Sequence, residues 1–320
     1  MNKNKLKFID LFSGMGGFRI AFESAGCKCV FSSEIDKNAV ETYELNFGDT
    51  PAGDITKIDA RDIPDHDILC AGFPCQAFSI AGKRLGFEDT RGTLFFDVAR
   101  ILKEKKPLAF FLENVKGLTN HDGGKTLKVI LSTLDSIGYQ YKFAVLNAMH
   151  YNVPQNRERW YCVGVRKDSG IDLNSFCFPE KRKLTNTVDK IILPRDNVSH
   201  KYDCTPTCED NVTYWVKQKN IDVTNMTLAY EIRKSKCQFK NDGISPCLTA
   251  KMGTGGNNVP VVVSQMRKLT EEECLEIMGY PKTYKLTGGY HSYKQIGNSV
   301  VVPVISLIAK ELVKKIKDPR

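Results

Sequence analysis

The chain has no hydrophobic run long enough to cross a membrane. The longest run, residues 300–309, is far shorter than the roughly 20 residues that a membrane-spanning helix needs. Asp10 interrupts the first apolar stretch before the core of a secretion signal could form. We therefore expect a cytoplasmic protein with no membrane partner.

The sequence also lacks the short motifs of several enzyme classes. No H-E-x-x-H, Walker A or G-x-S-x-G motif occurs, which disfavours the common zinc peptidases, nucleotide hydrolases and serine hydrolases. Eleven cysteines are an odd number in a chain without a secretion signal, so reduced thiols are expected. Four of them, at 204, 208, 237 and 247, are spaced C-x3-C and C-x9-C, which does not match paired zinc ligands. No bound metal is predicted.

Positive charge exceeds negative charge in this chain. There are 46 Lys and Arg residues against 37 Asp and Glu residues, a net charge of +9. Such a balance suits a polyanionic partner, but it is also common among proteins that bind no nucleic acid. Charge alone therefore gives only weak support for a nucleic-acid partner.

Two unlike regions follow each other along the chain. Up to about residue 167, apolar β-branched runs alternate with amphipathic stretches, which is typical of an α/β fold with a parallel sheet and helices on both faces. The expected strands are 7–11, 28–32, 67–71, 108–113, 141–148 and 161–165, and the expected helices are 18–25, 37–46, 93–103 and 125–137. Between 187 and 267 the helical periodicity fades and turn-forming residues dominate, which predicts a smaller loop- and β-rich domain. Helical spacing returns at 268–278, and 297–316 is expected to rejoin the first domain. The first domain is therefore predicted to comprise 1–186 and 296–320, and the smaller domain 187–267. The segment 268–295 is predicted to be a hinge and return segment.

A glycine-rich turn follows the first predicted strand. Gly14-x-Gly16-Gly17 lacks the third glycine of the dinucleotide fingerprint, so a pyrophosphate is disfavoured. Glu34, at the end of the second strand, is placed to accept hydrogen bonds from a ribose diol. Asp54, at the expected end of a third strand, is placed to accept from an adenine amino group. An adenosine-bearing ligand without a diphosphate fits this set, and the alternative is that the glycines only close a turn while both acids cap helices.

The segment Gly72-Phe-Pro-Cys75-Gln-Ala-Phe-Ser79 breaks off directly after an apolar strand. Ligands of open α/β sheets bind at the carboxyl ends of the strands, so Cys75 is presented where reactions take place. A buried cysteine is more often a small hydrophobic side chain than a nucleophile. Here Pro74 stiffens the preceding backbone, and the polar loop 76–91 that follows is expected to move as a lid.

Charged residues lie at the end of the next apolar strand and directly before the last one. Glu113 follows a hydrophobic run, where low polarity disfavours the charged carboxylate, so it is a candidate general acid; a helix cap or an ion pair is the alternative. Arg157 and Arg159 are two residues apart, and on an extended segment they point the same way, suited to fixing a carboxylate and a phosphate or a base carbonyl.

Six motifs in order carry a resemblance to a known family. They are DLFSGMGGF (10–18), GFPCQAFS (72–79), FLENVKG (111–117), QNRERWY (155–161), RKLTEEECLEIMGYP (267–281) and QIGNSVVVPV (295–304). The chain resembles the C5-cytosine DNA methyltransferases of the compact bacterial restriction-modification type over about 6–316, apart from a variable region. The resemblance implies a Rossmann-like S-adenosylmethionine-dependent methyltransferase sheet, with catalysis and cofactor binding in the first domain and target recognition at 187–267.

The resemblance also implies a role for each catalytic residue. Cys75 adds to C6 of a cytosine that has been flipped out of double-stranded DNA. Glu113 contacts ring N3 and the exocyclic amine, Arg159 binds the carbonyl O2, and Arg157 braces the site. The methylated product forms when C5 takes the sulfonium methyl group and then loses its proton and Cys75.

Cofactor and DNA contacts carry over in the same way. S-adenosylmethionine is assigned to Phe12, Gly14, Met15, Gly16, Gly17, Glu34, Ile35, Asp54, Ile55, Pro74, Leu94, Asn298 and Ser299, with Phe12 against the adenine. Ile35 departs from the aromatic residue that the family often carries at this place. DNA contacts are assigned to Gln76, Ser79, Lys83, Arg91, Lys251, Gly253, Gly255 and Gly256. The implied protein works as a monomer alongside a cognate restriction endonuclease.

Three alternatives remain beside this interpretation. An RNA cytosine methyltransferase would share Cys75 and Glu113, but it usually lacks an extended DNA-reading region such as 187–267. A DNA-binding protein that has kept the fold without catalysis would not need Cys75, Glu113 and both arginines. A nicotinamide oxidoreductase is disfavoured by the missing third glycine.

Overall fold

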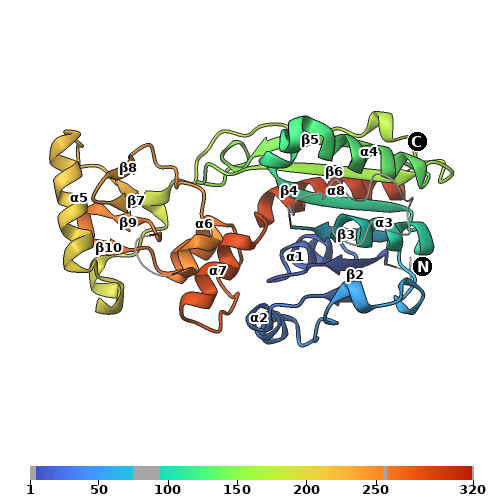
Figure 1. Cartoon of the computed structure of the whole chain (residues 1–320), viewed down its shortest axis with the longest axis horizontal. Helices are drawn as coiled ribbons and strands as arrows, with labels where there is room; N and C mark the ends of the chain where they lie inside the picture. The colour runs from blue at the N-terminus through green and yellow to red at the C-terminus, as the bar shows by residue number, and fades with distance from the viewer. Residues whose placement is uncertain (1–4, 75–93, 255–257, 319–320) are drawn as a thin grey trace. The chain divides into compact units, whose positions relative to one another are not determined.

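The computed structural model describes residues 5–74, 94–254 and 258–318 (Figure 1). Contacts divide the chain into two compact units. The first unit comprises Met1–Leu146, Glu158–Glu180 and Val304–Arg320, and the second comprises Asn147–Arg157 and Lys181–Pro303. Of the residues expected in the first domain, 147–157, 181–186 and 296–303 group with the second unit. The whole of the expected hinge and return segment, 268–295, also belongs to the second unit.

A six-stranded sheet forms the centre of the first unit. Its strands are β1 (Lys7–Leu11), β2 (Lys28–Ser33), β3 (Ile68–Gly72), β4 (Ala109–Val115), β5 (Tyr139–Asn147) and β6 (Glu158–Arg166), in the order β2-β1-β3-β4-β6-β5. The pairs from β2 to β4 are parallel, whereas β6 pairs antiparallel with β4. The predicted α/β fold is confirmed, and the mainly parallel sheet carries β6 as an antiparallel strand next to β4.

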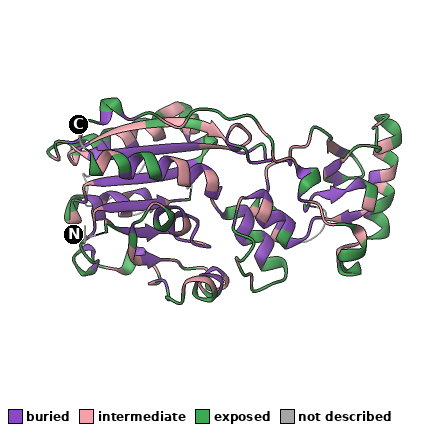
Figure 2. Cartoon of the chain, turned by 180° about the vertical axis from the view of Figure 1, so that it is seen from behind, coloured by how far each residue is buried: buried purple, intermediate pink, exposed green. Residues whose placement is uncertain are grey.

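Helices cover both faces of this sheet. They are α1 (Gly17–Ser24), α2 (Lys37–Phe47), α3 (Leu94–Lys105) and α4 (Lys125–Ser136), each close to its predicted range. Side chains alternate along the strands, so Ile9 of β1 and Phe110 of β4 enter the core that α3 and α4 complete. On the opposite face, Phe22 of α1 lies 5.3 Å from Phe8 and 6.2 Å from Phe111, measured between ring centroids. The inner strands β1, β3, β4 and β6 are mostly buried between these two layers, whereas the outer strands β2 and β5 are mostly half-buried (Figure 2).

A smaller sheet lies in the second unit. Its strands are β7 (Leu228–Arg233), β8 (Lys236–Lys240), β9 (Val261–Val262) and β10 (Arg267–Lys268), in the order β10-β9-β7-β8 and all antiparallel. Helix α5 (Pro206–Gln218) packs on it through Cys208 and Val212. The sequence predicts strands here but no helix, although Thr205 accepts a hydrogen bond from the Cys208 amide as an N-cap and Pro206 occupies the first turn.

Three helices end the chain. Helix α6 (Glu271–Ile277) begins with a capping box between Thr270 and Glu273, and it confirms the helical spacing seen at 268–278. Helix α7 (Tyr290–Asn298) ends just inside the segment 297–316, and α8 (Val302–Lys317) takes up most of the rest of it. Among the described helical stretches, Tyr290–Lys317 is long and apolar enough to cross a membrane, but 67% of its most apolar window is buried inside the protein, as in core helices of water-soluble proteins.

Candidate active site

The turn between β1 and α1 requires glycine. Backbone φ is +52° at Gly14 and +74° at Gly16, in the left-handed region that disfavours other residues. A Cβ at Gly16 would lie 2.3 Å from Cε2 of Phe47, so the Phe47 ring would have to move to make room for a side chain. A Cβ at Gly14 would meet no atom within 4 Å, so open space lies beside this part of the turn. The predicted strand, glycine turn and helix start are confirmed.

Glu34 connects the end of β2 to this glycine turn. Its Oε2 accepts a hydrogen bond from the Gly14 amide at 2.8 Å, and its Oε1 accepts from the amides of Ile35 and Asp36, both at 2.8 Å. Helix α2 is capped by Asp36 and not by Glu34, so the alternative that Glu34 caps a helix is wrong. A carboxylate has about four acceptor positions, which leaves room for a ribose hydroxyl.

Asp54 has a different local role. It is the N-cap of a short 3-10 helix, Ile55–Lys57, and accepts hydrogen bonds from the Thr56 amide and hydroxyl at 3.0 and 2.7 Å. These bonds from Thr56 lower the pKa of the carboxyl group. The strand that is expected to end at Asp54 does not form. Only an isolated bridge between Ser33 and Ala52 occurs there. The helix-cap alternative therefore describes Asp54 correctly.

The remaining cofactor candidates differ in exposure. Ile35 is 70% exposed, whereas Met15 and Ile55 are buried. Phe12, Pro74 and Leu94 range from half-buried to exposed. Asn298 and Ser299 lie in the second unit, where the Ser299 hydroxyl hydrogen-bonds the Tyr280 hydroxyl. Their part in the cofactor site stays a prediction.

The nucleophile candidate follows β3, which ends at Gly72. Cys75 itself lies outside the described residues, as do Gln76, Ser79, Lys83, Arg91, Gly255 and Gly256. In the parallel pairing of β3 and β4, Gly72 stands opposite Glu113. Glu113 is therefore next to the strand end that leads into Cys75.

Glu113 pairs with Arg159 across neighbouring strands. Arg159 Nε lies 3.2 Å from Glu113 Oε1, and their side chains are only 14% and 11% exposed. The register of β4 and β6 sets Tyr161 opposite Glu113 and Arg159 opposite Val115, so both charged side chains share one face. The sequence indicates hydrophobic surroundings for Glu113, but the structure adds a cation to them. Burial and a neighbouring cation act on the protonation of a carboxyl group in opposite directions.

Arg157 binds a different set of groups. Its guanidinium donates to the carbonyl oxygens of Leu248 at 2.6 Å, Gly297 at 3.1 Å and Ser299 at 2.6 Å, all within the second unit. The sequence predicts that the two arginines point the same way, but they bind different partners. Strand β6 begins only at Glu158, so the alternation of side chains along the strand does not extend to Arg157. The bracing role fits these contacts better than direct contact with a base.

Asn114 is a residue that the sequence reasoning missed. It is 2% exposed, its side-chain amide donates to the Phe73 carbonyl at 2.8 Å, and its Oδ1 accepts from the Val115 amide at 2.8 Å. The bond to Phe73 fixes the backbone two residues before Cys75. The position of an asparagine directly after a candidate acid, near a strand end, is the sequence signal that could have identified it.

We expect Asn114→Ala to reduce turnover roughly tenfold to a hundredfold, because the backbone leading to Cys75 loses an anchor and small misplacements are costly in catalysis. Affinity for S-adenosylmethionine should change less than about twofold. Steady-state kinetics and calorimetric titration with the cofactor measure the two effects. A variant with reduced cofactor affinity and unchanged turnover would contradict this positioning role.

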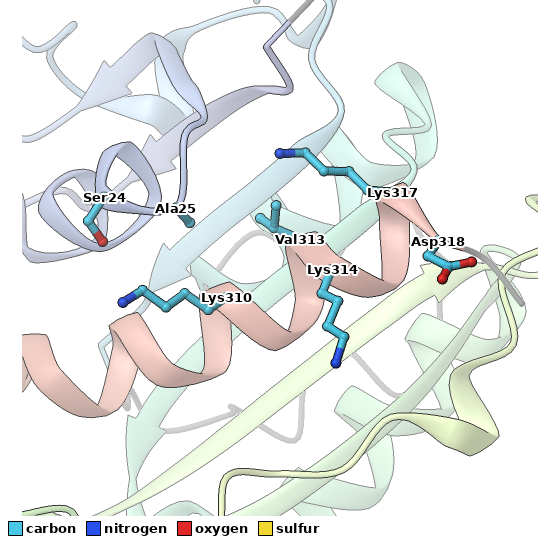
Figure 3. A pocket seen from close by; sticks show the side chains of 7 residues that line it. All are labelled: Ser24, Ala25, Lys310, Val313, Lys314, Lys317 and Asp318. Atoms are coloured by element: carbon cyan, nitrogen blue, oxygen red, sulfur yellow. The ribbon is translucent and has the colours of Figure 1, made fainter. Parts of the chain in front are cut away.

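A hollow of about 490 Å³ lies elsewhere in the first unit (Figure 3). It is lined by Ser24, Ala25, Lys310, Val313, Lys314, Lys317 and Asp318. Ser24 and Ala25 end α1, and the glycine turn precedes the start of that helix, so the hollow is not the predicted cofactor site. Among the residues that the structure describes, no group of three or more His, Cys, Asp or Glu side chains could hold a metal ion.

Comparison with known proteins identifies the family. Residues 6–314 match the family model of the C-5 cytosine-specific DNA methylases. The chain belongs to this family. Membership makes this methylase a cytosine-C5 DNA methyltransferase whose methyl donor is S-adenosylmethionine, and it confirms the resemblance carried by the six motifs.

Curated relatives agree with this assignment, and a solved structure shares the fold. The methylase is 45% identical to the type II methyltransferase M.HhaI of Haemophilus parahaemolyticus, covering 95% of this chain and 93% of the relative. It is 44% identical to M.HpaII of Haemophilus parainfluenzae, covering 98% and 91%. A crystal structure of a mutant DNMT2 of Spodoptera frugiperda superposes with a TM-score of 0.74 at 22% identity, covering 98% of this chain and all of that one, which shows a shared fold.

Proposed function

We propose that this methylase modifies a cytosine within a short specific sequence of double-stranded DNA, through a covalent bond between Cys75 and C6. The observation that carries the proposal is the Glu113–Arg159 pair, set opposite the strand end that leads into Cys75. An acid and a cation at that place match the N3 edge and the O2 carbonyl of a cytosine. The relatives are named type II methyltransferases, so we assign this chain the modification half of a restriction-modification system.

The chemistry of cytosine explains the arrangement. Its C5 is a weak nucleophile, and inside a duplex it is out of reach, so the base must leave the stack. Addition of the Cys75 thiolate to C6 moves electrons toward C5, and a hydrogen bond from Glu113 at N3 stabilises the resulting charge. Arg159 holds O2. After C5 has taken the methyl group, its proton passes to a solvent base, the electrons of that C–H bond re-form the C5–C6 double bond, and Cys75 leaves C6 as the thiolate.

The residues around the glycine turn fit S-adenosylmethionine. Open space beside Gly14, the Glu34 carboxylate bound to the Gly14 amide, and the exposed apolar Ile35 can receive a methionine moiety, a ribose and an adenine ring. The cofactor supplies an electrophilic methyl group on a sulfonium. Phe12 and Ile35 would hold the adenine, Glu34 the ribose, and Asp54 the adenine amine through the oxygen that does not bind Thr56.

We assign target recognition to the second unit, with Lys251 and Gly253 among its DNA contacts. We also propose a cytoplasmic monomer, because one active site treats one base at a time. The cognate endonuclease acts on the same DNA sequence and need not contact the methylase.

Glu113→Gln is expected to slow methyl transfer by about 10² to 10⁴, because the amide cannot donate a proton at N3. Both thiol addition and methyl transfer should slow, while cofactor affinity stays largely intact. Rapid-quench kinetics on a cognate duplex measure this effect, and Glu104→Gln on the exposed side of α3 is the matched control. Unchanged turnover in the Glu113 variant would remove Glu113 from the mechanism.

The proposed function is tested by methyl transfer from radiolabelled S-adenosylmethionine to double-stranded DNA, with duplex RNA and tRNA in parallel. Bisulfite sequencing of the DNA product locates the methylated cytosines. We expect label in DNA at cytosines of one short repeated context. Label in tRNA alone would contradict the proposal and favour an RNA methyltransferase, and cofactor binding without any transfer would favour a silent DNA-binding protein.

A further inference from the structure

The hairpin of β7 and β8 contains an irregular residue. The pairing shifts register between Tyr230 and Arg233, and Glu231 within this bulge has a φ of +51°. This left-handed conformation is disfavoured for a glutamate and free of penalty for glycine. Bulges redirect side chains and are frequent next to functional sites, and strained residues cluster at such sites.

Basic side chains surround the redirected carboxylate. Lys236 Nζ lies 2.5 Å from Glu231 Oε2, and the two side chains are 52% and 54% exposed. The hydrogen bond from Lys236 lowers the pKa of Glu231, and the charges of Arg233 and Lys251 lower it further. At neutral pH Glu231 is therefore an ionised, exposed group that only accepts hydrogen bonds.

A role in hairpin stability alone explains this arrangement poorly. Exposed ion pairs contribute little to stability because water and salt screen them, whereas the left-handed backbone at Glu231 works against it. Three exposed cations, Arg233, Lys236 and Lys251, instead lie close enough to act on the charge of Glu231, and together they suit a polyanion. Pairing of β7 with β9 is limited to Leu228 and Ala229, so beyond Ala229 the hairpin is a two-stranded ribbon. Such a ribbon fits the major groove of B-DNA, where an acidic side chain can accept from the N4 amine of cytosine.

We propose that Glu231 reads a base in the recognition sequence by accepting a hydrogen bond from a cytosine N4 amine in the major groove, while Arg233, Lys236 and Lys251 bind the flanking phosphates. This inference rests on the proposed function. Binding exchanges the Lys236 contact of Glu231 for the base, and Lys236 moves to a phosphate. Sequence preference at one position thus depends on Glu231, and salt-dependent affinity depends on the three cations.

The test compares Glu231→Gly and Glu231→Gln with the wild type on genomic DNA, methylated in vitro and read by bisulfite sequencing. Glycine suits a φ of +51°, so the first variant keeps the bulge and removes the carboxylate. Both variants should lose discrimination at one position of the motif by roughly tenfold or more. Lys251→Gln should weaken binding of all sequences alike and reduce the salt slope by about 1. Glu272→Gln, on an exposed position of α6, should leave the motif unchanged.

The outcomes separate this inference from the proposed function. If the wild type methylates one motif and both Glu231 variants keep the same preference at every position, the reading role of Glu231 is wrong while the proposed function stands. If the relaxed position is not a C·G pair, the assignment to cytosine N4 is wrong. If the wild type transfers no methyl group to DNA, the proposed function and this inference fail together.

Discussion

Replacing Cys75 by serine is expected to reduce methyl transfer by roughly a thousandfold or more, because a serine hydroxyl stays protonated at neutral pH and adds poorly to C6. DNA affinity should stay close to that of the wild type, because the change replaces one sulfur atom by oxygen and removes no charged group that contacts a phosphate. Radiolabel transfer and a gel-shift titration on the same duplex measure the two quantities.

The control for this prediction is another cysteine of the first unit. Cys177 is exposed, and Cys177→Ser should retain full turnover. The Cys75 variant with turnover near that of the wild type would contradict the nucleophilic role. Loss of DNA binding together with turnover would place Cys75 in the fold instead of the chemistry.

Breaking the ion pair between Arg267 and Glu273 is expected to have the largest effect on stability. The two side chains are 0% and 1% exposed, and two hydrogen bonds of 2.9 and 2.7 Å join them. Glu273 also accepts from the amides of Leu193 and Thr270, both at 2.8 Å. Glu273→Ala leaves a buried guanidinium without its counter-charge and should lower the free energy of unfolding by about 3–5 kcal/mol.

Urea unfolding of the full chain, followed by circular dichroism, measures this loss. The exposed pair of Asp135 and Lys167 provides the comparison, and Asp135→Ala should change stability by about 1 kcal/mol or less. A combined Arg267→Met and Glu273→Leu variant should recover part of the loss, because it buries no unpaired charge, while the amides of Leu193 and Thr270 still lose their acceptor. Equal stability of Glu273→Ala and the wild type would show that the buried pair is not required.

The sequence predicts the first unit closely because its elements carry strong local signals. Its strands are continuous apolar runs, and helices such as α2 begin at a capping acid, Asp36, and end at Gly48. Helix α5 has a weaker signal, since its buried residues are only Cys208 and Val212. Its N-cap and proline were readable, but the apolar period between them is too sparse to indicate a helix.

In the candidate site, too, features with a local sequence signal are predicted and features that depend on tertiary contacts are not. Motifs place Glu34 and Glu113 correctly near the carboxyl ends of β2 and β4, although β4 runs on from Glu113 to Val115, because that placement follows from local sequence. Their partners depend on tertiary register. Glu113 meets Arg159 only through the antiparallel pairing of β4 and β6, and Arg157 binds carbonyls of residues that are remote in the chain. No spacing in the sequence predicts these contacts.

The measurement that tests the central claim most directly is capture of the covalent bond between Cys75 and DNA. A duplex whose target cytosine carries fluorine at C5 cannot release a proton from that carbon, so the adduct should persist after methyl transfer. With S-adenosylmethionine present, we predict a denaturation-resistant complex of one chain with one duplex, and peptide mass spectrometry should locate the DNA on Cys75. A methylase that transfers methyl groups to ordinary DNA but forms no such adduct, or forms it at another residue, would contradict the account.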